Sequence, residues 1–162
     1  VVVLRPFNTY GPRQGERAVI PTIVRQALDP ACTAIKLGDL TTTRDFNYVS
    51  DTVAAFLAIG RAPEIEFGAP YNTGTGQAVS VADVLDRVRD LTGTNKPVES
   101  EAARVRPERS EVRTLLADPA RLAAATGWRA EVSLDEGLDH VVAWWRERLA
   151  GGSVRRSANY AT

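Results

Sequence analysis

The stretch "LRPFNTYGPRQ", residues 4–14, places polar side chains directly after a short apolar run. Asn8 offers a donor and an acceptor on one short side chain, and Tyr10 adds a phenol. Open α/β sheets bind ligands outside the carboxyl ends of their strands, so Asn8 is a candidate ligand contact. The alternative is structural: Asn8 would satisfy turn backbone while Gly11 and Pro12 break the chain. The pattern alone slightly favours the structural alternative.

A second stretch, "TTTRDFNYVSD" at residues 41–51, brings an arginine together with hydroxyls and aromatic rings. The planar guanidinium of Arg44 suits a phosphate, to which it can donate parallel hydrogen bonds. A loop arginine more commonly pairs with a nearby carboxylate, here Asp45 or Asp51. A third basic cluster, at residues 104–113, interleaves arginine with glutamate, and charge runs of this kind are usually solvated surface.

The other reactive groups form no familiar catalytic or metal-binding pattern. The single histidine, His140, falls among the apolar positions of a helical pattern, and the single cysteine, Cys32, cannot make a thiolate metal site by itself. The Ser/His/Asp order, CxxC and HExxH are all absent from the sequence. Gly74-Thr75-Gly76 lacks the third glycine and the acidic residue of a dinucleotide fingerprint. We therefore assign no catalytic residue and no metal ligand.

The composition is that of a globular protein without a dominating charge. Of 162 residues, 44% are hydrophobic, and 20 Lys and Arg balance 20 Asp and Glu, giving a formal net charge of zero. No global field would attract nucleic acid or an anionic membrane, so neither is an expected partner. No apolar stretch approaches the roughly 20 residues of a membrane helix, and the single cysteine suits a reducing cytoplasm. The chain lacks methionine and opens on Val1, which indicates a removed start or a piece of something longer.

Alternating short strands and helices are predicted from the apolar pattern, which indicates an α/β fold. Residues 1–5 are expected to form a strand buried on both faces, as in a parallel sheet. Further strands are predicted over residues 33–37, 44–49, 69–73 and 97–100. Cap residues or a proline in the first turn mark helices beginning near Pro21, Ser50, Ser80, Pro119 and Ser133.

The helix after Ser50 is expected to turn one apolar face to the core. Val53, Phe56 and Leu57 belong to that face, and Gly60 is expected to end the helix. Residues 1–150 are expected to form one folded portion. Residues 151–162 are polar and are expected to form a disordered tail.

Six motifs, taken in order, resemble one family. They are "LRPFNTYGPRQ" (4–14), "VIPTIV" (19–24), "IKLGDLTTTRDFNYVSDT" (35–52), "YNTGTG" (71–76), "RPERSEVRTLLADPARL" (106–122) and "TGW" (126–128). They are similar to the carboxyl-terminal half of extended short-chain dehydrogenase/reductases (SDRs), the NAD-dependent epimerase/dehydratase family that acts on nucleotide sugars. The resemblance is strongest to sugar-nucleotide 4,6-dehydratases, with 4-epimerases and UDP-glucuronate decarboxylases close behind. It implies the last strands of a Rossmann-type sheet and a small mixed α/β substrate-binding domain.

The resemblance also implies roles for particular residues in binding a nucleotide-diphosphate sugar. Asn8 matches an asparagine that contacts the diphosphate or sugar, and Asn72 matches one that lines the nucleotide pocket. Arg44 and Arg106 match arginines that bind the diphosphate from opposite sides, which reverses the structural interpretation of both. Weaker matches, to positions near the base and ribose, are Ala18, Val19, Ile35 and Leu37.

The implied cofactor is NAD, with Arg5, Pro6 and Phe7 near its nicotinamide end. In the family, the Gly-rich cofactor loop, the catalytic Tyr-x-x-x-Lys pair and the dehydratase Asp-Glu pair lie in an amino-terminal half that this sequence lacks. This fragment alone is therefore expected to be inactive, whereas the full-length enzyme would form a homodimer.

Three alternatives stay open at this point. A 4,6-dehydratase would oxidise C4, lose water across C5 and C6, and return the hydride to C6. A nucleotide-sugar 4-epimerase or a UDP-glucuronate decarboxylase would begin with the same C4 oxidation. A noncatalytic module that binds a nucleotide sugar or a protein is the alternative of another class.

Overall fold

The computed structural model describes residues 1–101 and 112–152, and the chain divides into two compact units. The first unit comprises residues 1–11, 43–79 and 114–137, and the second comprises residues 12–42, 80–113 and 138–162. Each unit is therefore built from three separate stretches of the chain. Arg106, most of the basic cluster and nearly all of the predicted tail lie outside the described residues.

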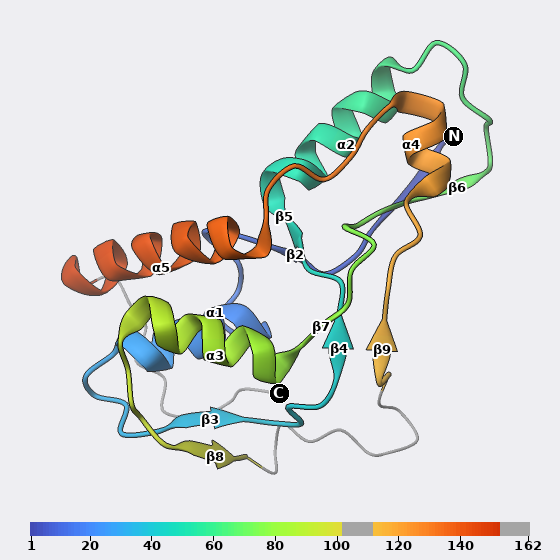
Figure 1. Ribbon diagram of the computed structural model, residues 1–162. Helices are drawn as coiled ribbons and strands as arrows, with labels where there is room; N and C mark the ends of the chain where they lie inside the picture. The colour runs from blue at the N-terminus through green and yellow to red at the C-terminus, as the bar shows by residue number, and fades with distance from the viewer. Residues whose placement is uncertain (102–111, 153–162) are drawn as a thin grey trace. The chain divides into compact units, whose positions relative to one another are not determined.

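Parallel strand pairs form the framework of the first unit (Figure 1). β1 (Val3–Pro6) pairs with β6 (Pro70–Thr73), and the register places Arg5 opposite Asn72. The shorter pairs are β2 (Thr9–Tyr10) with β5 (Asn47–Tyr48), and β4 (Thr43–Arg44) with β9 (Thr114–Leu115). β4 is the middle strand of a sheet in the order β7-β4-β9, in which β7 is Val79–Ser80. Because the pairs are parallel, the residues that follow paired strands leave from the same end.

Two helices cover the β1–β6 pair. α2 (Val49–Arg61) and α4 (Ala120–Thr126) meet a small core made by Ala55, Tyr71, Leu122 and Trp128. Tyr71 and Leu122 expose 2% and 0% of their surface, so this core is closed to solvent although it is small. The first unit therefore has a covered sheet face on the side of these helices.

The structure contradicts two expectations about exposure in the first unit. Val3 in β1 is 38% exposed, so the opening strand is not buried on both faces. In α2, Val53, Phe56 and Leu57 are 52%, 52% and 51% exposed, so their predicted inward orientation is wrong. The inward face instead carries Asp51, Thr52 and Ala55, because the two polar residues hydrogen-bond to distant segments and fix the rotation of the helix.

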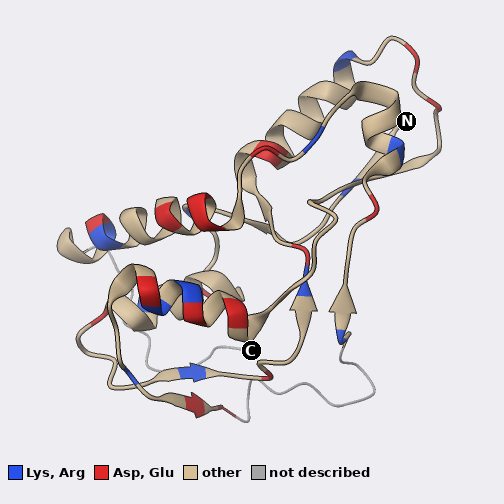
Figure 2. Cartoon of the chain, viewed as in Figure 1, with Lys and Arg blue, Asp and Glu red and all other residues tan. Residues whose placement is uncertain are grey.

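The ends of α2 also differ from the prediction. Tyr48, not Ser50, is the N-cap residue, and it makes no side-chain capping hydrogen bond. The helix continues through Gly60 to Arg61, where Ala62 is the C-cap. Figure 2 shows that α2 carries charge only near its two ends, at Asp51 and Arg61. An apolar outer stripe therefore runs along the helix between them.

The second unit is helical around one short strand pair. α1 (Val19–Leu28) packs against α3 (Val81–Thr92) and β3 (Ile35–Leu37), and β3 pairs in parallel with β8 (Val98–Ser100). The predicted capping box is confirmed, because Ser80 and Asp83 exchange hydrogen bonds at the start of α3. α5 (Leu134–Ala150) begins in the first unit, and most of it belongs to the second. The core of the second unit includes Ile20, Ile23, Val24, Ile35, Val84, Leu85, Val88, Leu138, Val141, Val142 and Trp145.

Among the described residues, no helix combines the length and the apolar character needed to cross a membrane.

Candidate functional site

The elbow after β1 is held by backbone and side-chain hydrogen bonds within the first unit. Phe7 N–H donates to the Thr73 carbonyl at 3.0 Å, which extends the β1–β6 pairing by one residue. Asn47 N–H donates to the Asn8 carbonyl at 3.3 Å, and Asn8 Nδ2 donates to the Asp45 carbonyl at 3.1 Å. Asn8 is half-buried, and its Oδ1 accepts no hydrogen bond from a described residue. The side chain thus supports the turn with its amino group and keeps an acceptor for a ligand.

Asp45 lies at the centre of these contacts and is fully buried. Its Oδ1 accepts from Thr75 N–H at 2.8 Å and from Thr75 Oγ1 at 2.7 Å. Its Oδ2 accepts from Gly76 N–H at 2.9 Å and from Ala117 N–H at 3.3 Å. Its own N–H donates to the Leu115 carbonyl at 2.8 Å. One carboxylate therefore joins β4, the loop after β6 and the segment after β9.

The Gly74-Thr75-Gly76 turn serves this carboxylate. The N–H groups of Thr75 and Gly76 both bind Asp45, so the turn holds an internal anion where a phosphate loop would hold a ligand. A Cβ at Gly74 would collide with the Ala117 side chain and lie 2.7 Å from Asp45 Oδ2. Glycine at this position is needed for the close approach of the turn to Asp45.

Arg44 and Asn72 stand beside the same centre. Arg44 is the last residue of β4 and directly precedes Asp45. Its side chain is half-buried, and its Nη1 donates a hydrogen bond to the Thr43 carbonyl at 2.8 Å. The two aspartates proposed as its structural partners have other roles, because the Asp45 and Asp51 carboxylates accept from backbone N–H groups. Asn72 is half-buried on β6 and donates to the Asp118 carbonyl at 3.4 Å.

A buried amide and hydroxyl network lies behind the elbow. Asn47 is fully buried, and its Nδ2 donates to Thr52 Oγ1 at 2.9 Å and to Thr73 Oγ1 at 3.2 Å. Thr9 Oγ1 lies 3.0 Å from Thr52 Oγ1. The network links β2, β5, α2 and β6 behind Asn8. Asn47 Nδ2 and the threonine hydroxyls satisfy one another and position the elbow, whereas the buried Asn47 Oδ1 accepts no hydrogen bond from a described residue.

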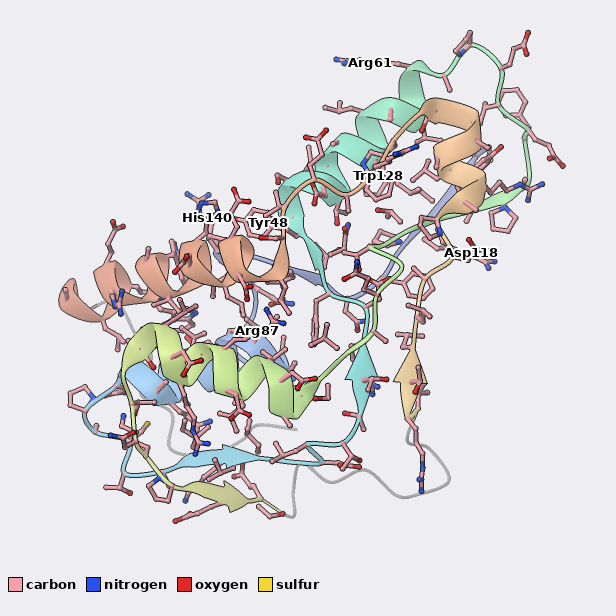
Figure 3. The ribbon with its side chains drawn as sticks, viewed as in Figure 1. Tyr48, Arg61, Arg87, Asp118, Trp128 and His140 are labelled. Atoms are coloured by element: carbon pink, nitrogen blue, oxygen red, sulfur yellow. The ribbon has the colours of Figure 1, made fainter. Side chains whose placement is uncertain are left out.

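Asp51 fastens the segment that follows α4. Its Oδ2 accepts from the N–H groups of Glu131 and Val132 at 3.2 and 3.1 Å, and its carbonyl accepts from Trp128 Nε1 at 3.1 Å. Figure 3 shows Trp128 lying against α2 at this junction. Trp128 therefore packs helices, as the sequence predicts, and Asp51 acts as a structural carboxylate.

The two tyrosines of the elbow region remain neutral phenols. Tyr10 is 2% exposed, packs edge-on against Tyr48 and Phe46, and donates to the Leu134 carbonyl at 3.4 Å. Burial raises its pKa well above the ordinary value, and the nearby Tyr48 phenol adds to that shift. Burial also raises the pKa of Tyr48, with a smaller contribution from Glu136. The buried Tyr10 phenol, bonded to the Leu134 carbonyl, is therefore a structural group.

The remaining predicted site residues fall at two places. Arg5 and Pro6 are exposed at the end of β1, and Phe7 is half-buried beside them. In the second unit, Ile35 and Leu37 are buried in the core, and Val19 is a half-buried residue at the start of α1. Asp45, Asn47 and Thr75 were not predicted as site residues. The sequence signal for these residues is a polar residue inside an apolar run, together with a Gly-rich turn whose N–H groups need acceptors.

A family model described as GDP-mannose 4,6 dehydratase matches residues 1–141 of this chain. The chain belongs to this family. The related proteins are NAD-dependent epimerases, dehydratases and decarboxylases of the extended SDR class, which confirms the resemblance of the motifs.

Individual relatives show how much of such an enzyme is present. The chain is 30% identical to the GDP-6-deoxy-D-mannose reductase of Pseudomonas aeruginosa over 153 residues, which cover 92% of this chain and 49% of the reductase. It is 30% identical to the UDP-glucose 4-epimerase of Mycolicibacterium smegmatis, covering 90% of this chain and 45% of the epimerase. The chain thus spans about half the length of the curated relatives it matches.

Solved structures confirm the fold class. The structure of MoeE5 in complex with UDP-glucose and NAD matches with a TM-score of 0.80 at 33% identity, over 92% of this chain and 48% of MoeE5. The mixed α/β chain with parallel strand pairs is therefore part of a Rossmann-type extended SDR fold, as predicted. NAD or NADPH is present in solved members, in agreement with the expected cofactor of the family.

Proposed function

We propose that this chain is the substrate-binding half of an NAD-dependent nucleotide-sugar 4,6-dehydratase. The observation that carries the proposal is that three candidate contacts lie on segments that meet at one buried residue, Asp45. Asn8, Arg44 and Asn72 come from three segments, and Asp45 is bonded to the first, adjoins the second and holds the turn after the third. Segments arranged in this way suit a ligand that must be oriented as well as bound.

The proposed ligand contacts match the chemistry of a nucleoside diphosphate. A diphosphate carries about two negative charges, and each charge-assisted hydrogen bond from an arginine contributes about 1.5 to 3 kcal/mol. Arg44 would donate to the phosphate oxygens, with Arg106 as the second arginine. Asn8 Oδ1 would accept from a sugar hydroxyl. Val19, Ile35 and Leu37 are the weaker candidates for the base and ribose, since the side chains of Ile35 and Leu37 are buried and their strand pairs with β8.

The residues at the end of β1 fit a partial contact with NAD. Arg5 and Pro6 are exposed there, and Phe7 continues the pairing with β6, so this end of the strand presents a defined edge. The phosphates of NAD need another binding loop, because the N–H groups of Thr75 and Gly76 are already bonded to Asp45. When bound, the cofactor supplies the hydride acceptor for oxidation at C4 and returns the hydride at C6.

The complete enzyme would need a second segment for catalysis. Residues 1–150 would form the substrate-binding portion, with β1 as one strand of a larger sheet. The outer stripe of α2 supports this proposal, since Val53, Phe56 and Leu57 are about half exposed, and a contiguous exposed apolar patch marks a surface that another segment can cover. The complete enzyme would act as a homodimer.

Two other reactions of the family are alternatives. Nucleotide-sugar 4-epimerases and nucleotide-sugar decarboxylases are as similar to this chain as a 4,6-dehydratase is. All three reactions would use the same diphosphate contacts. The choice of a dehydratase rests on the sequences of residues 5–13 and 35–51 and on the matching family model. A noncatalytic binding module is the alternative of another class.

The test is an activity screen of the protein expressed from its complete reading frame. NAD-loaded protein is incubated with GDP-mannose, dTDP-glucose, UDP-glucose and UDP-glucuronate, and the products are identified by mass spectrometry. A dehydratase yields a 4-keto-6-deoxy sugar that has lost one water. An epimer of unchanged mass identifies an epimerase, and loss of carbon dioxide identifies a decarboxylase. Binding without turnover of any substrate, or no upstream Tyr-x-x-x-Lys motif, supports the noncatalytic module.

A further inference from the structure

We infer that Asp45 is the positioning residue that keeps the three candidate ligand-binding segments in register. The inference rests on the proposed function for the identity of the ligand, but the coupling of the segments stands on the contacts of Asp45 alone. Asp45 is not itself a candidate substrate contact. It would act through Asn8, Arg44 and the turn that follows Asn72.

The contacts of Asp45 are unusual in their reach along the chain. Through its carbonyl it holds Asn8, 37 residues earlier, and through its carboxylate it holds Thr75 and Gly76, 30 and 31 residues later. The bond from Ala117 spans 72 residues. Each of these segments leaves the end of a different strand. A single residue, through its side chain and its peptide group, therefore connects the end of the β1–β6 pair with the end of the β4–β9 pair, which belong to separate sheets.

The charge of Asp45 makes these contacts directional. Four donors point at its two carboxylate oxygens, and within the described residues none of the four is a lysine or arginine. Two of those donors meet each oxygen, so both oxygens must be acceptors. An asparagine would fit the same volume, yet its NH₂ group would face two donors in either orientation. Asp45→Asn therefore removes the acceptor pattern without opening a cavity.

Asp51 provides a matched control in the same unit. It is 4% exposed, compared with 0% for Asp45, and its Oδ2 also accepts from two backbone N–H groups. Those groups belong to Glu131 and Val132, where no candidate ligand contact lies. Asp51→Asn therefore reproduces the loss of a buried charge, although its amide oxygen can take the place of Oδ2, and it leaves the ligand-binding segments bonded to Asp45.

The first measurement is amide hydrogen exchange without ligand, on the protein from its complete reading frame. In Asp45→Asn we expect exchange to rise at the direct partners Thr75, Gly76 and Ala117. We also expect a rise of about tenfold or more at Phe7 and Asn47, whose N–H groups hold the elbow without touching the carboxylate. Asp51→Asn should leave Phe7 and Asn47 protected, and any rise in exchange should be confined to Glu131 and Val132. If Phe7 and Asn47 keep their protection, or if both variants expose them equally, the positioning role is wrong.

The second measurement is the affinity for UDP and GDP by isothermal titration calorimetry, at matched folded fractions. Asp45→Asn should weaken binding by about tenfold or more relative to Asp51→Asn. If Asp45→Asn misfolds, Thr75→Val gives a graded test, because among the four bonds to the carboxylate it removes only the hydroxyl donor at 2.7 Å, together with the local contacts of that hydroxyl to Gln77. Equal affinities in all variants overturn the positioning role while leaving the proposed function intact. If UDP, GDP and, in the same titrations, dTDP all fail to bind the parent protein, the proposed function is refuted, and hydrogen exchange then still decides the coupling.

Discussion

Replacing Gly74 with alanine tests the packing around Asp45 by adding one methyl group. The new Cβ would collide with the Ala117 side chain and approach Asp45 Oδ2 to 2.7 Å and Asp45 Cγ to 3.1 Å. Gly74 is not among the glycines with positive φ, so the change acts through space and not through backbone strain. Every neighbour is buried, and a shift of the carboxylate disturbs bonds to Thr75, Gly76 and Ala117 together.

The expected cost follows from three effects. Overpacking in a well-packed region costs about 1 to 3 kcal/mol. A displaced carboxylate loses the equivalent of one charge-assisted hydrogen bond, about 1.5 to 3 kcal/mol. The reduced entropy of the unfolded chain offsets about 0.4 to 1 kcal/mol. We therefore expect the free energy of unfolding to fall by about 2 to 5 kcal/mol.

Urea denaturation followed by tryptophan fluorescence and circular dichroism measures this change. Gly60→Ala is the control, because no atom lies within 4 Å of the added Cβ and the residue is inside α2. That variant should gain up to about 1 kcal/mol from helix propensity. Ordinary surface substitutions change the free energy of unfolding by less than about 0.5 kcal/mol. If the free energy of unfolding of Gly74→Ala lies that close to the value of the parent protein, the tight approach of the turn to Asp45 is wrong.

Three further predictions concern the capping box, the outer stripe of α2 and the Trp128 hydrogen bond. Hydrogen bonds from the Ser80 side chain and backbone lower the pKa of Asp83. The Asp83 carboxylate therefore contributes fully to stability above its ordinary pKa of about 3.9, and this contribution disappears as the pH falls through the lower folded-state pKa. In an NMR titration, Ser80→Ala should return the Asp83 pKa toward its ordinary value, and an unmoved pKa contradicts the assigned cause. Phe56→Gln should change the stability of the 162-residue chain by no more than about 1 kcal/mol, because the ring is 52% exposed. In a longer protein that buries the ring, the same change should lower the free energy of unfolding by about 3 to 5 kcal/mol. Equal effects in both proteins would show that nothing covers the stripe. Trp128→Phe keeps an aromatic ring in the buried site but leaves the Asp51 carbonyl without its Nε1 donor. Chemical denaturation should therefore show that the free energy of unfolding falls by about 1 to 3 kcal/mol. An unchanged denaturation midpoint counts against this bond.

Features with local causes were predictable from the sequence. The start of α3 follows from Ser80 and Asp83, which bond to each other across one turn. Its end follows from Gly93, which takes the left-handed conformation at the C-cap. The fold class and the family likewise follow from motifs that are contiguous in the chain. In each case the interacting residues are close in sequence, so no tertiary information is needed.

The orientation of α2 and the role of Asp45 depend on contacts that the sequence does not place. Both faces of α2 carry apolar residues, so periodicity cannot decide which face is buried. Asp51 decides it by accepting hydrogen bonds from residues 80 and 81 positions later in the chain. Asp45 was considered as a partner for Arg44, but its actual partners lie in turns at residues 75, 76 and 117. A single sequence carries no signal that pairs such distant positions.

The central claim is that Arg44 helps this half of the enzyme to hold a nucleotide-sugar diphosphate. Its most direct test is the KM for the nucleotide-sugar substrate in the protein from the complete reading frame, compared between Arg44→Ala and Arg61→Ala. Arg61 is an exposed arginine at the end of α2 and serves as the control. We predict that Arg44→Ala raises KM roughly 10- to 150-fold, the equivalent of one charge-assisted hydrogen bond, while NAD stays bound and Arg61→Ala has no effect. An unchanged KM in Arg44→Ala would contradict the account.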